Sequence, residues 1–484
     1  MIIVSITGPT MKEALAQIAG SSPFAEMIEL RLDLIREPSL GMIMAATRKP
    51  IVATCRPKSL GGGFDGTETE RVEILEAASL LGAAFVDVEL GTDSAILREF
   101  LSRKESRVIL SHHEYGRVPD VSRLYARMRA YNAPVLKFAY VAHDSADIRH
   151  AVEFLTLAGG DKQKAIAIAM GEFGEASRVL YKKFGAWATF ASAEDGGNAA
   201  PGQIPASVLK KLYRADRISR RTRVYGVVGN PLGQSKGIFL HNPLFQRARV
   251  NAVYCRFPTR RIAAFMNHLA PMLNGFSVTI PHKRTIMKHL DRLDRTATAI
   301  GAVNTVLRKG GKFVGTNTDA PGALDAIERV TKVAGRRMLI LGAGGAARAI
   351  AYEARMRGAA VLLTNRSEQR GRKLAREFGV PYVGSGDVAQ AVRRCDIIVN
   401  ATPVGMVPNA GASPLPRRLL NKKIVFDVVY NPPMTKLLRD ALKAGATIIP
   451  GTEMYLNQAA RQCALYAGVK PSLAAMRRIL GSAR

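Results

Sequence analysis

The chain has 484 residues, of which 47% are hydrophobic, and a formal net charge of +31. The hydrophobic fraction excludes a disordered chain, and no apolar run reaches the ~18 residues that a membrane-spanning helix needs. The positive charge favours anionic partners without dictating a fold. Basic residues are spread along the sequence, and the dense run 214–223 lacks the interleaved aromatic residues of a single-strand binder, so nucleic-acid binding is a remote alternative.

The four cysteines, Cys55, Cys255, Cys395 and Cys463, lie far apart and form no CxxC pair. We therefore expect neither a metal site nor a disulfide framework, and a reducing cytoplasm is the simplest setting. The first eight residues alternate like a strand and lack a basic segment followed by an apolar one, so no signal peptide is predicted.

Eight short apolar runs, separated by segments with helical periodicity, occupy the first 213 or so residues. The runs are Ile2–Thr7, Met27–Asp33, Ile51–Arg56, Ala83–Leu90, Arg107–Glu114, Pro134–Val141, Lys164–Gly171 and Ala188–Ser192. Helical patterns lie between them, for example in Thr69–Leu81 and Ser122–Tyr131. Eight strands that alternate with helices predict a compact (β/α)8 barrel.

Polar residues recur late in these runs, where a parallel strand should be nearly all apolar. They are Glu29, Arg31, Asp33, Arg56, Asp87, Glu89, Ser111, His112 and His113. Because the carboxyl ends of the strands form the catalytic mouth of such a barrel, the set predicts an active site there.

Lys137 lies inside the otherwise apolar run Pro134–Val141. A lysine there is costly unless it is paired or neutral, and a neutral amine can attack a carbonyl to form a Schiff base. His113, one strand earlier, could move protons beside it. The alternative is a structural ion pair of Lys137 with Glu29 or Glu89.

Several segments resemble type I 3-dehydroquinate dehydratase, in order and over the whole first half. They are Glu29–Asp33, Thr54–Pro57, Ser111–Tyr115, Lys137 and Ala200–Gln203. The resemblance implies that Lys137 forms an imine with the substrate ketone and that His113 acts as acid and base. It also implies a set of substrate-holding residues, in which arginine forks suit a carboxylate: Glu29, Arg31, Arg56, Arg178 and Gln203.

Two positions depart from that family. Leu60 stands where the family usually has glutamate, and Ala199 stands where it tends to have serine. Both lie in loops that resemble substrate lids. One alternative is therefore a purely structural barrel, with the second half as the active enzyme.

A basic linker, residues 216–222, ends the predicted barrel domain of residues 1–215. The strand Arg223–Val228 then leads into the turn-rich loop Gly229–Ser235. A second strand and loop follow at Gly275–Lys283, and polar segments occupy Gly301–Thr305 and Gly315–Asp319.

The segment Arg337–Leu341 has the pattern of a strand that enters a glycine turn. The helical segment Ala349–Arg357 and a second strand, Val361–Thr364, follow at βαβ spacing, which predicts a Rossmann domain. In such a turn the backbone approaches the pyrophosphate at the helix N-terminus. The turn supplies Gly342, Gly344, Gly345 and Ala346.

The end of the second strand selects the cofactor. An NAD site places Asp or Glu there, whereas this chain has Asn365, Arg366 and, close behind, Arg370. An arginine at this place would clamp a 2′-phosphate, so NADP is predicted. The alternative is an exposed arginine beside an NAD site that uses Asn365.

The motifs of residues 223–484 resemble shikimate dehydrogenase. The resemblance implies that Lys283 and Asp319 are the catalytic pair, and that Thr402 and Gly451 also contact the cofactor. It implies a substrate-binding domain of residues 223–325 with 455–484, and an NADP-binding domain of residues 326–454. The residues implied at the substrate are Ser235, Ser277, Thr279, Asn304, Tyr430 and Gln458.

The substrate loop reads Gln234–Ile238, and Gly237 replaces the second serine of the family's His-Ser-x-Ser-Pro. The lost hydroxyl leaves quinate dehydrogenase as an alternative. Ser277 stands where many relatives have asparagine, and serine is frequent in the fused form of the family. The sequence thus predicts a two-enzyme fusion that acts on small molecules, without a metal, and leaves the oligomeric state open.

Overall fold

The computed structural model describes residues 1–102, 107–194, 199–233 and 235–482. It divides into two compact units. The first comprises Met1–Val224 with Asn251–Met272, and the second comprises Tyr225–Val250 with Leu273–Arg484. Each unit is described by itself.

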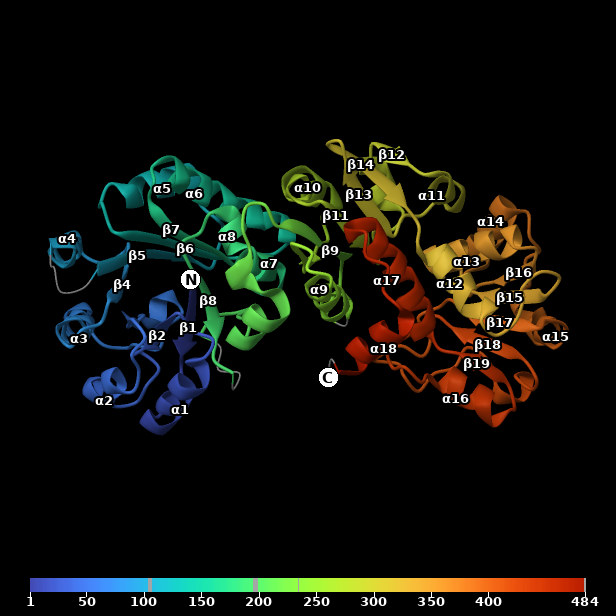
Figure 1. Cartoon of the computed structure of the whole chain (residues 1–484), viewed down its shortest axis with the longest axis horizontal. Helices are drawn as coiled ribbons and strands as arrows, with labels where there is room; N and C mark the ends of the chain where they lie inside the picture. Colours follow the sequence, from blue (N-terminus) through green and yellow to red (C-terminus); the bar gives the residue numbers. More distant parts are fainter. Residues whose placement is uncertain (103–106, 195–198, 234, 483–484) are drawn as a thin grey trace. The chain divides into compact units, whose positions relative to one another are not determined.

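Within the described residues, the first unit has eight parallel strands in the order β7-β6-β5-β4-β3-β2-β1-β8 (Figure 1). Trp187, just before β8, donates a backbone hydrogen bond to Ala165 in β7 (2.8 Å), which joins the two ends of the sheet. The predicted (β/α)8 barrel is therefore confirmed. The strands are β1 Ile2–Ile6, β2 Met27–Arg31, β3 Ile51–Thr54, β4 Phe85–Glu89, β5 Arg107–Glu114, β6 Val135–Val141, β7 Lys164–Met170 and β8 Thr189–Ser192.

Helices follow the barrel strands and surround the sheet (Figure 1). Two of them begin with a capping box, in which a threonine and the glutamate three residues later bond each other's backbone: Thr10 with Glu13, and Thr67 with Glu70. The helices are α1 Met11–Ser21, α2 Leu40–Ala45, α3 Glu68–Leu80, α4 Ser94–Ser102, α5 Val121–Arg129, α6 Ile148–Gly160, α7 Glu175–Val179 and α8 Tyr181–Phe184.

The segment Asn251–Met272 contains strand β10 (Ala252–Pro258) and helix α10 (Ile262–His268). The buried Asp144, which follows β6, holds this segment. Asp144 accepts hydrogen bonds from Thr259 Oγ1 (2.7 Å) and from the backbone N–H of Arg260 (2.8 Å).

In the second unit, strands β9, β11, β13, β14 and β12 follow one another in a mixed sheet. These strands carry the loops in which the catalytic pair is expected. Their bounds are β9 Arg223–Gly229, β11 Gly275–Val278, β12 Arg292–Leu293, β13 Thr305–Lys309 and β14 Lys312–Thr316. The helices beside them are α9 Gly237–Arg247, α11 Arg295–Ile300, α12 Asp319–Glu328, α17 Gly451–Ala467 and α18 Leu473–Ser482.

The other sheet of this unit is parallel, in the order β16-β15-β17-β18-β19 (Figure 1). The chain leaves β15 for β16 on one side and later returns to β17 on the other, which creates the switch point where such folds bind ligands. The Rossmann prediction is confirmed. The elements are β15 Arg337–Leu341, α13 Gly345–Met356, β16 Ala360–Thr364, α14 Glu368–Phe378, α15 Val388–Arg394, β17 Ile397–Asn400, β18 Ile424–Asp427, α16 Lys436–Lys443 and β19 Thr447–Ile449.

The helices of the described ranges are all too short or too polar to cross a lipid bilayer.

Candidate active sites

Strand periodicity directs the polar residues of the barrel into its interior. Side chains two residues apart on a strand face the same way. On β6, Val135 and Ala139 belong to an apolar cluster to which the other barrel strands also contribute, so Lys137 between them points inwards as well. The same spacing of two relates Asp87 and Glu89 on β4.

One pocket at the carboxyl ends of the barrel strands collects the whole predicted dehydratase set. Besides these residues it is lined by apolar side chains such as Ile168, Met170 and Phe190. The predicted residues come from β2, β5, β6 and α7 and from the loops after β3 and β8, and they meet at one place. The predicted residues that line it are Glu29, Arg31, Arg56, His113, Lys137, Arg178 and Gln203.

Lys137 is paired with two carboxylates, and the nearer one, Asp87, is not one of the two that the sequence suggested. Its Nζ donates to Asp87 Oδ2 (2.7 Å), whereas Glu29 Oε1 lies 4.0 Å away. Ser111 Oγ also donates to Asp87 (2.6 Å). Burial alone would raise the pKa of Asp87, yet Lys137 and Arg56 hold that pKa below its ordinary value. Of the two partners in the alternative, Glu29 thus lies at ion-pair distance from Lys137, and the nearest partner is Asp87.

His113 lies beside Glu89, with its Nδ1 2.9 Å from Glu89 Oε1. Arg56 Nε donates to the same carboxylate (3.1 Å). Burial and the nearby Arg56 lower the pKa of His113 to about 4, so the imidazole is neutral at pH 7. Asp87 and Glu89 belong to the polar set that predicted an active site late in the strands, but neither was given a catalytic or substrate-binding role from the sequence.

Hydrogen bonds within the protein hold other predicted barrel residues in place. Arg31 forms a fork with Asp33 (2.9 and 2.6 Å) and donates to the carbonyl of Ala199 (3.0 Å). Gln203 Nε2 donates to Ser5 Oγ (3.1 Å). Ala199 lines the pocket.

Two arginine nitrogens in this region are buried donors that make no hydrogen bond within the described residues. Arg178 bonds the carbonyls of Phe190 (3.2 Å) and Pro201 (3.3 Å), but its Nε is buried without a hydrogen-bond partner among the described residues. Arg56 Nη2 is likewise buried without a hydrogen-bond partner among the described residues. Burial lowers the pKa of Arg178 to about 10, which leaves the guanidinium charged at pH 7. Buried donors of this kind normally have a hydrogen-bond acceptor.

In the second unit, Lys283 Nζ donates to Asp319 Oδ2 (2.6 Å). Asp319 is the first residue of α12, and the side chain of Asn317 accepts its backbone N–H (3.0 Å), which fixes the turn. The stem of Lys283 lies against the glycine turn, because a Cβ added at Gly345 would be 3.1 Å from its Cδ. The predicted pair therefore adjoins the predicted cofactor site.

A hydrogen-bond network joins three of the predicted substrate residues. Thr318 Oγ1 receives a bond from Asn304 Nδ2 (2.9 Å) and donates to Gln458 (3.4 Å). Ser277 Oγ donates to Gln462 (3.0 Å), whose Nε2 donates to Thr305 (2.9 Å). Thr318, Thr305 and Gln462, which act as the links, were not among the residues predicted from the sequence.

Three other predicted residues are held by contacts of their own. The N–H of Thr279, directly after β11, donates to Val228 O (2.9 Å), and that of Ser235 donates to Leu232 O (2.9 Å). Tyr430 stacks on Tyr455, with 5.1 Å between ring centroids, and burial raises its pKa. Gln234 of the predicted loop lies outside the described residues.

The glycine turn is built for a close backbone approach. Gly342 has φ 124°, and a Cβ there would lie 2.8 Å from Ala401 O, so a side chain does not fit. Gly344 is the N-cap of α13, and Gly345 with Ala346 begins the helix, whose N–H groups suit a phosphate. Thr402 Oγ1 donates to Asn400 (2.6 Å) at the end of β17.

Asn365 follows the last residue of β16, and its Nδ2 closes the turn by a bond to Ser367 O (2.8 Å). Arg366 and Arg370 are exposed just beyond. Gly451, the first residue of α17, packs tightly, since a Cβ there would lie 2.5 Å from Val429 O.

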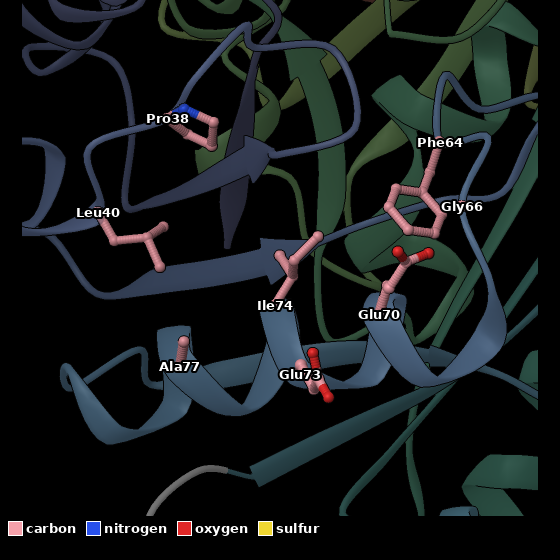
Figure 2. Close-up of a pocket in the computed structure, with 8 residues that line it drawn as sticks. All are labelled: Pro38, Leu40, Phe64, Gly66, Glu70, Glu73, Ile74 and Ala77. Atoms are coloured by element: carbon pink, nitrogen blue, oxygen red, sulfur yellow. The ribbon is translucent and has the colours of Figure 1, made fainter.

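Another hollow lies on the barrel's surface beside α3, and Figure 2 shows Glu70, Glu73 and Ile74 of this helix along it. None of the predicted site residues lines it. It is lined by Pro38, Leu40, Phe64, Gly66, Glu70, Glu73, Ile74 and Ala77. Among the described residues, no group of three or more His, Cys, Asp or Glu side chains could hold a metal ion.

Family models match successive parts of the chain. The model of type I 3-dehydroquinase matches residues 2–220, and that of the shikimate dehydrogenase substrate-binding domain matches residues 227–306. A bifunctional 3-dehydroquinate dehydratase/shikimate dehydrogenase of Arabidopsis thaliana, described as chloroplastic, is 34% identical over 473 residues, or 92% of this chain and 78% of the relative. The chain belongs to this bifunctional family.

Other known proteins are similar to the whole of this chain or to a part of it. A shikimate biosynthesis protein of Chlamydia pneumoniae is 28% identical over 96% of this chain and 95% of its own length. A Thermus thermophilus shikimate 5-dehydrogenase, solved with NADP(H) and shikimate, superposes with a TM-score of 0.51 at 33% identity and covers 54% of this chain and 100% of its own. Residues 337–431 match a model described as coenzyme F420-dependent NADP oxidoreductase. The bifunctional enzyme is thus a lyase and an oxidoreductase with small-molecule substrates.

Proposed function

We propose that the barrel converts 3-dehydroquinate to 3-dehydroshikimate and that the second unit reduces this product to shikimate with NADPH. The main support is the meeting of the seven predicted barrel residues in one pocket. The proposed domains are residues 1–215, 223–325 with 455–484, and 326–454, joined by the linker 216–222. The four free cysteines are buried, which suits a reducing cytoplasm.

In the barrel, Lys137 Nζ attacks the substrate ketone, the carbonyl oxygen leaves as water, and an imine forms. The iminium charge, which Asp87 faces, acidifies the neighbouring carbon. His113 takes a proton from that carbon and returns it to the leaving hydroxyl, which departs as a second water. Hydrolysis of the imine then frees Lys137. Arg56 and Arg178 offer their unpaired N–H groups to the substrate oxygens.

In the second unit, Lys283 holds and protonates the substrate oxygen while Asp319 orients the ammonium. The close backbone approach at Gly342 and the N-terminus of α13 fit a dinucleotide. When bound, the dinucleotide supplies the hydride. We propose substrate contacts for Ser235, Ser277, Thr279, Asn304, Tyr430 and Gln458, and cofactor contacts for Gly342, Gly344, Gly345, Ala346, Asn365, Arg366, Arg370, Thr402 and Gly451.

The whole pathway is tested by giving 3-dehydroquinate and NADPH to the purified chain and measuring shikimate. Shikimate production is expected from this single protein. Activity on 3-dehydroshikimate alone would show a structural barrel, and accumulation of 3-dehydroshikimate would show an inactive second unit. A comparison of shikimate and quinate oxidation decides between the two substrates that the loss of a hydroxyl at Gly237 leaves open.

Arg366→Ala is expected to raise the Michaelis constant for NADPH by roughly tenfold or more. A guanidinium that faces the 2′-phosphate makes charge-assisted hydrogen bonds, each of which contributes ~1.5–3 kcal/mol. NADH lacks this phosphate, so its use should hardly change. The effect should shrink as salt rises, because ions screen exposed charges.

Arg376→Ala provides the matched control, since Arg376 is likewise an exposed arginine but lies within α14, away from the turn that carries Arg366. Its kinetics should equal those of the wild type. Equal losses with NADPH and NADH in Arg366→Ala would assign Arg366 to the shape of the turn. A wild-type preference for NADH would refute the NADP proposal.

A further inference from the structure

His113 faces a carboxylate that comes from a rigid strand. Glu89 is the last residue of β4, and His113 lies near the end of β5, two residues beyond Ser111, which pairs with Glu89 in the register. The two oxygens of Glu89 lie 2.9 and 3.2 Å from His113 Nδ1. Both side chains are buried, with 6% of His113 and 4% of Glu89 exposed.

A second contact fixes Glu89 in this position. Arg56 Nε donates to Glu89 Oε1 (3.1 Å), so the carboxylate is held between a guanidinium and an imidazole. Burial alone would raise the pKa of Glu89, but His113 and Arg56 lower it to about 2, which keeps the side chain ionised at neutral pH. Leu60, at the family's glutamate position, belongs to a short 3₁₀ turn, Lys58–Leu60, and is not among the pocket-lining residues.

An ionised carboxylate can only accept hydrogen bonds. The neutral imidazole of His113 must therefore carry its proton on Nδ1, where it meets Glu89, and its Nε2 has a free lone pair. His113 lines the same pocket as Lys137. This arrangement suits a base that takes a proton from a carbon next to the imine.

We propose that Glu89 is a positioning residue of the dehydratase: it fixes the Nδ1–H tautomer of His113 and stabilises the imidazolium that forms when Nε2 takes the substrate proton. The role rests on the proposed dehydratase function. Glu89 itself does not exchange a proton with the substrate. The proton moves from the substrate carbon to Nε2 and then to the leaving hydroxyl, so that water departs.

The charges around His113 determine what loss of Glu89 would do. Arg56, two residues after β3, and Lys137 on β6 disfavour a protonated imidazole, whereas Glu89 favours it. Asp87 on β4 and Glu29 on β2 complete the charged surroundings through their contacts with Arg56 and Lys137. Without the charge of Glu89, the two cations would prevail and His113 would become a weaker base.

Glu89→Gln tests this role, because glutamine keeps the shape of the side chain and removes its charge. We expect the plateau of dehydratase kcat/KM to fall about 100-fold. The pH profile of kcat/KM should have an acidic limb near the His113 pKa of about 4. In Glu89→Gln this limb should move to lower pH, since Glu89 normally raises that pKa. A merely structural residue would lower the plateau and leave the limb in place.

Further measurements separate this role from damage to the fold. Borohydride should still trap substrate on Lys137 in Glu89→Gln, and reduction of 3-dehydroshikimate should stay at the wild-type rate. Glu89→Asp, which keeps the charge on a shorter side chain, should return the limb to its wild-type position. Glu114→Gln is the matched control: Glu114 lies on the same end of β5, bonds the N–H of Gly116, and should have wild-type kinetics.

A plateau within threefold of the wild type and an unmoved limb in Glu89→Gln would overturn the proposal. Loss of the trapped adduct together with the rate would also overturn it, because Glu89 would then be needed for imine formation. A wild-type chain that does not dehydrate 3-dehydroquinate would contradict the proposed function, and this role with it.

Discussion

Lys137→Ala is expected to abolish the dehydration of 3-dehydroquinate and to leave the reduction of 3-dehydroshikimate at the wild-type rate. Among the described residues that line the pocket, Lys137 alone carries an amine, and the proposed imine requires its Nζ, which Asp87 now holds at 2.7 Å. The reductase lies in a separate compact unit with a core of its own. Both rates are measured on the same protein preparation.

The alanine variant also leaves Asp87 as a buried charge without its nearest cation, a change that typically costs ~3–5 kcal/mol. Lys137→Arg is therefore the better control, since a guanidinium keeps the charge but does not form an imine. It should be folded and equally inactive. Borohydride reduction with substrate, followed by digestion, should place the adduct on Lys137 in the wild type. An adduct on another residue would refute the imine mechanism.

Lys283→Met is expected to lower kcat for the reduction of 3-dehydroshikimate by roughly 100-fold or more. Methionine keeps an apolar stem against Gly345, where the Lys283 chain now lies, and removes the ammonium that would stabilise the substrate oxygen. Affinity for NADPH should change little, which a fluorescence titration measures. Dehydration should continue at the wild-type rate.

Asp319→Asn supplies the companion variant for this pair. It keeps a side chain beside Lys283 but loses the negative charge that the ammonium meets at 2.6 Å. We expect a smaller loss in kcat than for Lys283→Met, and a double variant no worse than Lys283→Met alone. Additive losses would show that the two residues act independently.

Local patterns in the sequence were enough for the fold and for most of the site. Alternation of apolar runs with helical segments predicted the eight barrel strands, because burial on both faces makes such strands apolar. The same rule made Lys137 conspicuous as a charge inside one of these runs. The glycine turn before α13 could also be predicted from the sequence, since a backbone position such as Gly342, with φ 124°, favours glycine.

The partners of these residues depended on tertiary structure. Asp87 is 50 residues from Lys137, and the register of β4, β5 and β6 brings it to 2.7 Å. In the second unit, Gln462 reaches Thr305 across 157 residues of sequence. Short-range periodicity carries no information about such distances.

The sequence by itself determined which side chains face the barrel interior and which turn has the backbone shape that suits a dinucleotide, because strand alternation and backbone dihedral limits act over a few residues. Tertiary structure alone decided that Asp87 pairs with Lys137 and that Glu89 holds His113. Several carboxylates late in the strands could have served each role. Closure of the barrel sets the stagger between neighbouring strands, and that stagger selects which carboxylate lies within hydrogen-bond distance.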